Sequence, residues 1–142
     1  KTWAGFFGMI LAACLSQLVW GLLSECIIPL GETNELYRNH GNSPIFNAIA
    51  GTLFGLAYVL CELPNSFIKR RIDIPSGKTA GGIKGAVFFI IDQIDSLLGV
   101  VLVLAMFTHI TFAQYIQYII LGAFTHIALN FILLKLKIRK NI

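Results

Sequence analysis

Two acidic residues, Asp92 and Asp95, stand inside the apolar segment 87–104 of this chain. An ionised carboxylate in hydrocarbon is costly, so acids in such segments are usually paired, hydrated or bound to metal, and are usually functional. Their spacing of three residues places both side chains on one face of a helix. Together they form a doubly anionic oxygen site that suits a hard divalent cation. We therefore expect Asp92 and Asp95 to be Mg²⁺ ligands.

The structural alternative for these acids is a buried, hydrogen-bonded pair that neutralises a lysine. Two carboxylates so close together repel each other when both are ionised, unless a cation lies between them. This repulsion favours a metal site over a bare pair.

A second group of charges follows the second apolar segment, where Lys69, Arg70 and Arg71 are consecutive. Taken alone, such a cluster commonly sets the orientation of a membrane protein. Beside a pair of acids on the same side of the membrane, it is typical of a polyphosphate site, in which Lys and Arg neutralise phosphate oxygens. The glycine-rich stretch 75–85 contains Lys78 and Lys84. It is either a loop that closes over phosphates or a linker.

The composition indicates the kind of protein that must position these residues. The chain has 142 residues, of which 56% are hydrophobic and 13% charged, and its mean hydropathy is +0.77. A soluble domain carries about 25% charged residues. The composition is therefore that of an integral membrane protein. The net charge of +4 comes mostly from residues that flank apolar segments, which argues against nucleic-acid binding.

The apolar segments are close to the roughly 20 residues that span a bilayer, and helices are the default because backbone groups must be satisfied within each segment. The sequence predicts an all-α, polytopic membrane bundle that forms a single domain, 1–142, with a cytoplasmic catalytic loop at 64–86. The predicted transmembrane helices are four, at 3–23, 44–63, 84–109 and 112–136.

The distribution of basic residues predicts the orientation in the cell membrane. The loop 64–85 and the C-terminal tail are basic, whereas the loop 24–43 is acidic. Because positive loops stay in the cytoplasm, the multi-pass chain should carry Asp92 and Asp95 in the cytoplasmic half of their helix. A cytosolic nucleotide could then reach them.

Small and polar residues suggest how the helices pack. Gly51 and Gly55 form a G-x-x-x-G pattern that allows close helix approach. This contact could lie within one protomer or between two copies, so a homodimer stays open. The first helix carries a similar stripe, which we also expect to pack: Gly5, Gly8, Ala12 and Ser16. His126 and Asn130 share one face of the last helix and are expected to make interhelical hydrogen bonds.

The ordered motifs resemble the CDP-archaeol synthase family, which is similar to the larger CDP-diacylglycerol synthases. The stretch Glu62–Arg71 contains the Ser-x-x-Lys-Arg element of those enzymes, and Asp92 and Asp95 match their Asp-x-x-Asp element. The opening residues Lys1–Gly8 and the pair His126-x-x-x-Asn130 resemble further family patterns. The resemblance covers nearly the whole chain.

The resemblance implies a cytidylyltransferase that uses CTP and a lipid phosphate to form a CDP-lipid and pyrophosphate. It implies that Lys69, Arg70, Asp92 and Asp95 are catalytic, with Mg²⁺ held by the two acids. Substrate binding is expected of a further group of residues: Ser66, Asn65, Arg71, Glu62 and Lys1.

The chain also departs from the family patterns. Ala4 replaces the arginine of the opening motif, and the loop after Asp73 lacks the Pro-Gly-His-Gly-Gly pattern of the larger synthases. Since the chain starts inside the opening motif, we expect it to be truncated at the N-terminus.

A small transporter that binds a cation or proton at Asp92 and Asp95 is the alternative function. A transport path would need polar residues through the outer half of the helix. The residues 97–107 offer none. The polarity is one-sided, as expected of an active site that faces one membrane surface.

Overall fold

The computed structural model describes residues 2–26, 34–75, 78 and 80–137, and this part of the chain contains helices and no strand. Four of the helices are long and apolar enough to cross a membrane, which confirms the predicted all-α class. Short α2 was not predicted. The elements are α1 (Trp3–Cys26), α2 (Glu35–Arg38), α3 (Pro44–Arg71), α4 (Gly82–Phe107) and α5 (Phe112–Lys135).

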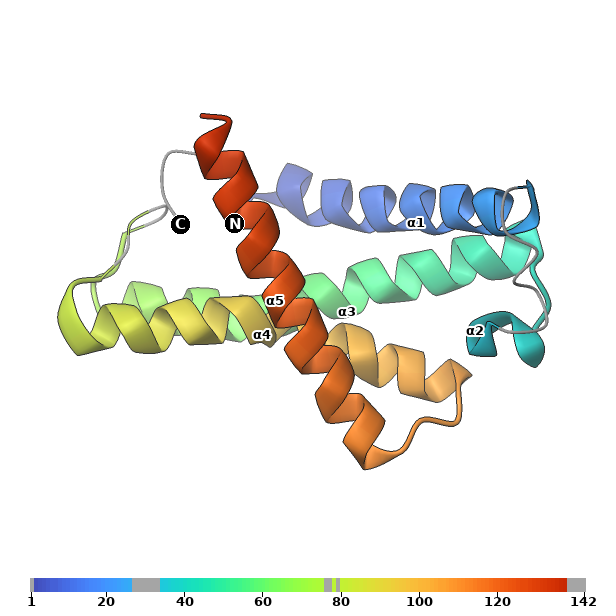
Figure 1. Cartoon of the computed structure of the whole chain (residues 1–142). Coiled ribbons are helices and arrows are strands. Elements are labelled where there is room, and N and C mark those ends of the chain that lie inside the picture. The colour runs from blue at the N-terminus through green and yellow to red at the C-terminus, as the bar shows by residue number, and fades with distance from the viewer. Residues whose placement is uncertain (1, 27–33, 76–77, 79, 138–142) are drawn as a thin grey trace.

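The long helices pack in series, with α1 on α3, α3 on α4, and α4 on α5 (Figure 1). In Figure 1, α1 and α3 run side by side while α5 crosses α4 steeply. Much of the outer surface is apolar, with side chains such as Trp3 and Phe124 exposed at 76% and 69%. Such exposure is unfavourable in water, but it is the expected surface of a protein that faces lipid.

The G-x-x-x-G pattern of α3 packs against α1 within the chain. A Cβ atom added at Gly51 would lie 2.7 Å from the Cα of Cys14, and one at Gly55 would lie 2.7 Å from the Cα of Ile10. No side chain other than hydrogen fits this approach. The contact left open by the sequence is therefore made inside the protomer.

The small stripe expected on α1 does not pack in the described chain. Gly5, Gly8, Ala12 and Ser16 are all exposed, and a Cβ added at Gly8 would meet no atom within 4 Å. The expectation was wrong because the opposite side of α1, around Ala13 and Gln17, turns to α3. Gln17 finds hydrogen-bond partners there, whereas the small stripe offers none.

The α3 helix is longer than predicted. We expected it to end at Leu63, but it continues through Pro64 to Arg71, for a total of 28 residues. A proline removes one backbone donor from a helix, and helices in membranes tolerate this loss. At about 1.5 Å per residue α3 is about 42 Å long, more than the roughly 30 Å of hydrocarbon. Its basic end can therefore reach the membrane surface.

The extension corrects the bounds of the expected loop 64–86. Residues 64–71 belong to α3 and residues 82–86 to α4, so the connection between the two helices is only 72–81. Within this connection, residues 76–77 and 79 lie outside the described part. The candidate residues Glu62, Asn65, Ser66 and Lys69 consequently stand on a rigid helix, where their spacing places them on one face.

At the opposite end of α3, polar side chains join three helices. Asn47 of α3 accepts hydrogen bonds from Gln17 of α1 at 3.0 Å and from the Tyr37 hydroxyl of α2 at 3.0 Å. Its amide nitrogen donates to Asn42 at 2.6 Å, and Asn42 donates to the carbonyl of Gly21 at 2.8 Å. This network fixes the ends of α1, α2 and α3 relative to one another.

Candidate functional site

The acid pair lies on the face of α4 that packs against α3, one helical turn apart. Asp95 is buried, with 8% of the residue exposed. The side chain of Asp92 is 40% exposed. One carboxylate therefore lies in the helix interface and the other at its opening, so a bound group can reach the pair from one direction.

Asn65 of α3 joins the two acids. Its amide nitrogen donates one hydrogen bond to Asp92 and one to Asp95, both at 2.7 Å. Asn65 is itself buried, with 7% exposed. Both N–H groups of the amide are therefore used to hold the carboxylates together. Asn65 directly follows Pro64, so the continuation of α3 past Pro64 places this bridge on the helix.

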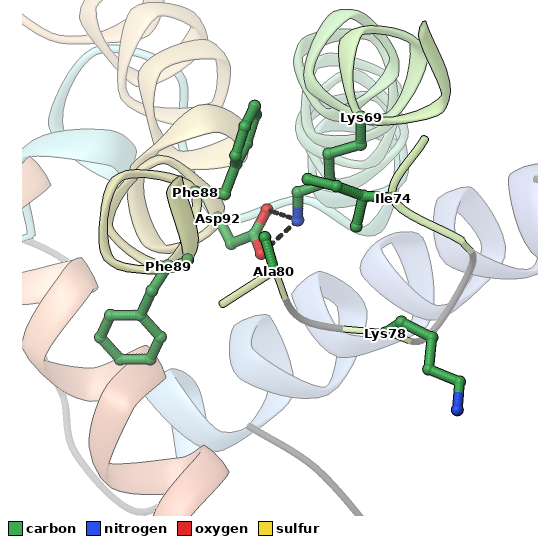
Figure 2. A pocket seen from close by; sticks show the side chains of 8 residues that line it. Lys69, Ile74, Lys78, Ala80, Phe88, Phe89 and Asp92 are labelled. Atoms are coloured by element: carbon green, nitrogen blue, oxygen red, sulfur yellow. Dashed lines mark hydrogen bonds and ion pairs between the residues drawn. The ribbon is translucent and has the colours of Figure 1, made fainter. Parts of the chain in front are cut away.

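Lys69, one turn beyond Asn65, forms an ion pair with Asp92. Its ammonium lies 2.5 Å from each carboxylate oxygen, as the dashed lines in Figure 2 show. It also lies 5.6 Å from the centre of the Phe88 ring, a cation–π contact. This arrangement matches the structural alternative, a hydrogen-bonded pair that neutralises a lysine. The same ammonium lines the pocket beside Asp92.

Asp95 has a second partner on its own helix. Its other carboxylate oxygen accepts a hydrogen bond from the backbone N–H of Ser96 at 2.6 Å. Glu62 of α3 lies close enough to interact electrostatically with Asp95. The interface thus gathers three carboxylates, Glu62, Asp92 and Asp95. Negative charge concentrated in this way favours the binding of a cation.

A pocket opens beside Asp92, between the end of α3, the start of α4 and their connection. In Figure 2, Lys69 points to Asp92, whereas the ammonium of Lys78 extends away from it toward solvent. The pocket combines two cations, one acid and an apolar wall. Its lining residues are Lys69, Ile74, Lys78, Ala80, Gly85, Phe88, Phe89 and Asp92.

The structure places the remaining predicted residues less favourably. The Arg70 guanidinium donates to the backbone carbonyl of Ile74, and that of Arg71 lies 5.1 Å from the Phe67 ring. Neither of these contacts is with the acid pair. Ser66 is half-buried beside Asn65, and Lys1 lies outside the described residues. Hydrogen bonds thus join four of the predicted residues to one another: Asn65, Lys69, Asp92 and Asp95.

The donor set around the acids fits a hard divalent cation. Carboxylate and amide oxygens are the ligands that Mg²⁺ and Ca²⁺ prefer. Asn65 Oδ1 is buried and has no hydrogen-bond partner among the described residues. Leaving such an oxygen unpaired costs about 1–3 kcal/mol. Among the described residues, no three His, Cys, Asp or Glu side chains are arranged to hold a metal ion by themselves.

Helix α5 contributes to the same region from the far side of α4. The Asn130 amide donates to Gln93, which lies between the two acids in sequence, at 3.5 Å. The His126 ring packs edge-on against Tyr58 of α3 at 6.4 Å. The expected interhelical hydrogen bond is confirmed for Asn130. Asn130 therefore contacts the acid-bearing stretch of α4, while His126 contacts α3.

Sequence reasoning missed how Asn65, Ile74 and Phe88 are used. Asn65, which the sequence suggested as a substrate-binding residue, also bridges the two acids, and this contact was not predicted. Its spacing from Glu62 and Lys69 on one helical face was the available signal. The sequence did not predict this shared face because the expected helix ended at Leu63, before Pro64. No comparable signal singled out Ile74 or Phe88.

A scan against protein-family models matches the whole chain, residues 1–142, to the model described as "CarS-like: CDP-archaeol synthase". Searches of curated proteins and of solved structures found no match.

Proposed function

This chain belongs to the CDP-archaeol synthase family, and on that premise we propose that it transfers CMP from CTP to a lipid phosphate. The family indicates a CTP-dependent cytidylyltransferase in general terms. The products would be a CDP-lipid, of the CDP-archaeol or CDP-diacylglycerol type, and pyrophosphate. Such a reaction belongs to phospholipid biosynthesis.

The observation that carries the proposal is the position of Asp92. It lies at the border between the buried acid pair and the pocket that contains Lys69 and Lys78. Phosphoryl-type transfer depends mainly on positioning and on charge neutralisation. An anionic pair beside a basic pocket is suited to hold a cation and a polyphosphate at the same time.

The bond changes define what the site must do. An oxygen of the lipid phosphate attacks the α-phosphorus of CTP and forms a new P–O bond. The bond from the α-phosphorus to the bridging oxygen breaks, and pyrophosphate leaves with that electron pair. No proton has to be removed from an ionised phosphate, so the chain needs no general base for this step.

The side chains then take distinct roles. Asp92 and Asp95 would hold Mg²⁺, which would supply positive charge to neutralise the phosphates. Lys69 and Lys78 would contact the triphosphate or the departing pyrophosphate, with Ser66 as a hydrogen-bond donor. Arg70 would assist only after leaving its contact with the Ile74 carbonyl.

The geometry also suits two substrates of opposite polarity. The pocket lies at the end of α3 and α4 where the helices join through 72–81, beyond their apolar portions. Lipid tails can remain in hydrocarbon while the phosphate meets CTP at the membrane surface. The positive charge of this end supports a cytoplasmic location under the positive-inside rule.

The test is an assay of full-length protein in nanodiscs with α-phosphate-labelled CTP. Label should move into the lipid phase, and pyrophosphate should appear, only with both a lipid phosphate and Mg²⁺. Parallel reactions with phosphatidic acid and an isoprenoid-ether glycerol phosphate would identify the lipid. The absence of labelled lipid with either acceptor would contradict the proposal.

Matched variants assign the acids. Asp92→Asn and Asp95→Asn should each lower turnover by at least about 100-fold, because each removes half of the anionic pair. Asp73→Asn is the control, since Asp73 is exposed in the connection and has a positive φ of 62° that asparagine tolerates. Proton or cation flux in liposomes with no CTP turnover would instead support a transporter.

A further inference from the structure

The side-chain amide of Asn65 has a donor end that is fully used and an acceptor end that is not. The nitrogen donates to Asp92 and Asp95 at 2.7 Å each. The oxygen of the same amide is buried without a partner in the described chain. Buried polar atoms nearly always have a partner, so an orphaned oxygen beside two acids calls for an explanation.

We propose that Asn65 is the third oxygen ligand of the divalent cation, reached by a half-turn of its amide. The inference rests on the proposed function, because it concerns the cation that Asp92 and Asp95 would bind there. It assigns to Asn65 a contact with the metal in place of the contact with substrate expected from its position in the motif.

The chemistry of the amide explains both states. Without a cation, an amide oxygen facing two carboxylates would be repelled by them, so the N–H groups face the acids and bridge them. With a cation between the acids, the N–H groups would be repelled and the oxygen attracted. Rotation about the terminal side-chain bond exchanges the two ends in nearly the same volume.

The geometry supports this exchange. The Asn65 nitrogen is at hydrogen-bond distance from both acids, so after rotation the oxygen takes a place beside the same two carboxylates. α3 holds Asn65 from one side and α4 holds the acids from the other, and the two helices pack closely where Gly99 meets Ala57 and Cys61. A divalent cation would then draw three oxygen ligands from two packed helices, with further positions left for phosphate and water.

The decisive comparison is between Asn65→Asp and Asn65→Ala in full-length protein in detergent, without CTP. Mn²⁺ serves as the probe, and its free concentration is read from the electron paramagnetic resonance signal. Aspartate supplies an oxygen but cannot donate a hydrogen bond, whereas alanine supplies neither. We expect Asn65→Ala to weaken Mn²⁺ binding about 10- to 100-fold, and Asn65→Asp to bind at least as tightly as the original.

If Asn65 only clamped the acids through hydrogen bonds, Asn65→Asp would weaken Mn²⁺ binding as much as Asn65→Ala, and that result would overturn the proposal. Asn47→Ala is the matched control. Asn47 is a buried asparagine on the same helix, 3% exposed, at the opposite end. Its loss should leave the affinity for Mn²⁺ unchanged in folded protein.

A measurement on the original sequence keeps the proposal testable if Asn65→Asp fails to fold. Protein labelled with ¹³C at the asparagine side-chain carbonyl should show a ¹³C coupling to bound Mn²⁺ in electron–nuclear double resonance. Bound Mn²⁺ without that coupling would refute the ligand role. Turnover of CTP is measured on the same preparation. An active enzyme without the ¹³C coupling would refute the ligand role of Asn65 while leaving the proposed function intact.

Discussion

Lys69 of α3 and Asp92 of α4 are joined by an ion pair in which the ammonium lies 2.5 Å from each carboxylate oxygen. Both oxygens of Asp92 that a metal would use are thus in contact with a cation of the chain itself. Under the proposed function, Lys69 would compete with a metal for Asp92. Once displaced from Asp92, its ammonium would remain at the mouth of the pocket, where it could contact a phosphate.

This competition predicts opposite effects of Lys69→Gln on two quantities. Affinity for Mn²⁺ without nucleotide should rise about two- to fivefold, because this factor corresponds to the free energy that a partly exposed ion pair typically contributes. Turnover of CTP should fall, since a phosphate contact is lost. Metal titration and the labelled-CTP assay measure the two effects. Lys84→Gln is the control, since it removes an exposed cation near the start of α4 and should change neither quantity. An unchanged or weaker Mn²⁺ affinity in Lys69→Gln would disprove the competition.

The basic residues near the pocket should differ in importance. Lys78 lines the pocket, while the Arg71 guanidinium is stacked on Phe67. Lys78→Gln should raise the KM for CTP about two- to fivefold at low salt, and the difference should shrink as salt screens the charge. Arg71→Gln should change the KM less. A larger effect at Arg71 than at Lys78 would mean that Arg71 leaves Phe67 to meet the nucleotide.

Close packing of α4 on α3 should be needed for the site. A Cβ at Gly99 would lie 2.5 Å from the sulfur of Cys61 and 2.8 Å from the carbonyl oxygen of Ala57. Gly99→Val should force the helices apart, with a loss of stability of about 1–3 kcal/mol. It should also reduce turnover, because Asn65 and Asp95 would separate. Thermal unfolding and the CTP assay provide the two readouts.

Gly8→Ala on α1 is the control for Gly99→Val, since a Cβ at Gly8 would meet nothing within 4 Å. Alanine is favoured over glycine in a helix by roughly 0.5–1 kcal/mol. The control should therefore be neutral or slightly stabilising. A loss of stability in Gly8→Ala would show that the exposed face of α1 is covered by another molecule.

The polar network at the other end of α3 should affect stability without affecting chemistry. Asn47→Leu removes the acceptor that Gln17 and Tyr37 share. Gln17 still donates to the Tyr37 hydroxyl at 3.2 Å, so the buried Tyr37 hydroxyl is the donor that loses its acceptor, at a cost of about 1–3 kcal/mol. The melting temperature should drop, while kcat measured below it should remain close to that of the original. A selective loss of kcat in folded Asn47→Leu would link the two ends of the helix.

Tyr37 should make stability depend on alkaline pH. It lies in α2, outside the candidate membrane spans, and burial raises the pKa of its hydroxyl above the usual value near 10. The folded state thus favours the neutral form. Its contribution is complete below about pH 10 and is lost as pH rises through the elevated pKa. Between pH 8 and 11, the melting temperature of the original protein should fall more steeply with pH than that of Tyr37→Phe. An equal pH dependence of the two melting temperatures would contradict this prediction.

The sequence by itself determined the helical class, the approximate spans and the identity of the acid pair. Hydrocarbon allows few alternatives to helices, so apolar length fixed the elements. Asp92 and Asp95 stood out because charge is rare and costly in such a segment. Both predictions rest on local properties of the chain, namely solvation and spacing along one helix.

Only the tertiary structure decided what faces those acids. Pro64 suggested a helix end, yet α3 runs on to Arg71 because packing on α4 and the tolerance of membrane helices for proline outweigh one missing backbone hydrogen bond. That continuation brings Asn65 and Lys69 against Asp92, whereas the Arg70 guanidinium donates to the Ile74 carbonyl and that of Arg71 stacks on Phe67. Which of the three consecutive cations meets the Asp92 carboxylate depends on how α3 is rotated and how closely it packs on α4. That packing involves residues such as Gly99, Cys61 and Ala57, which lie outside the basic cluster.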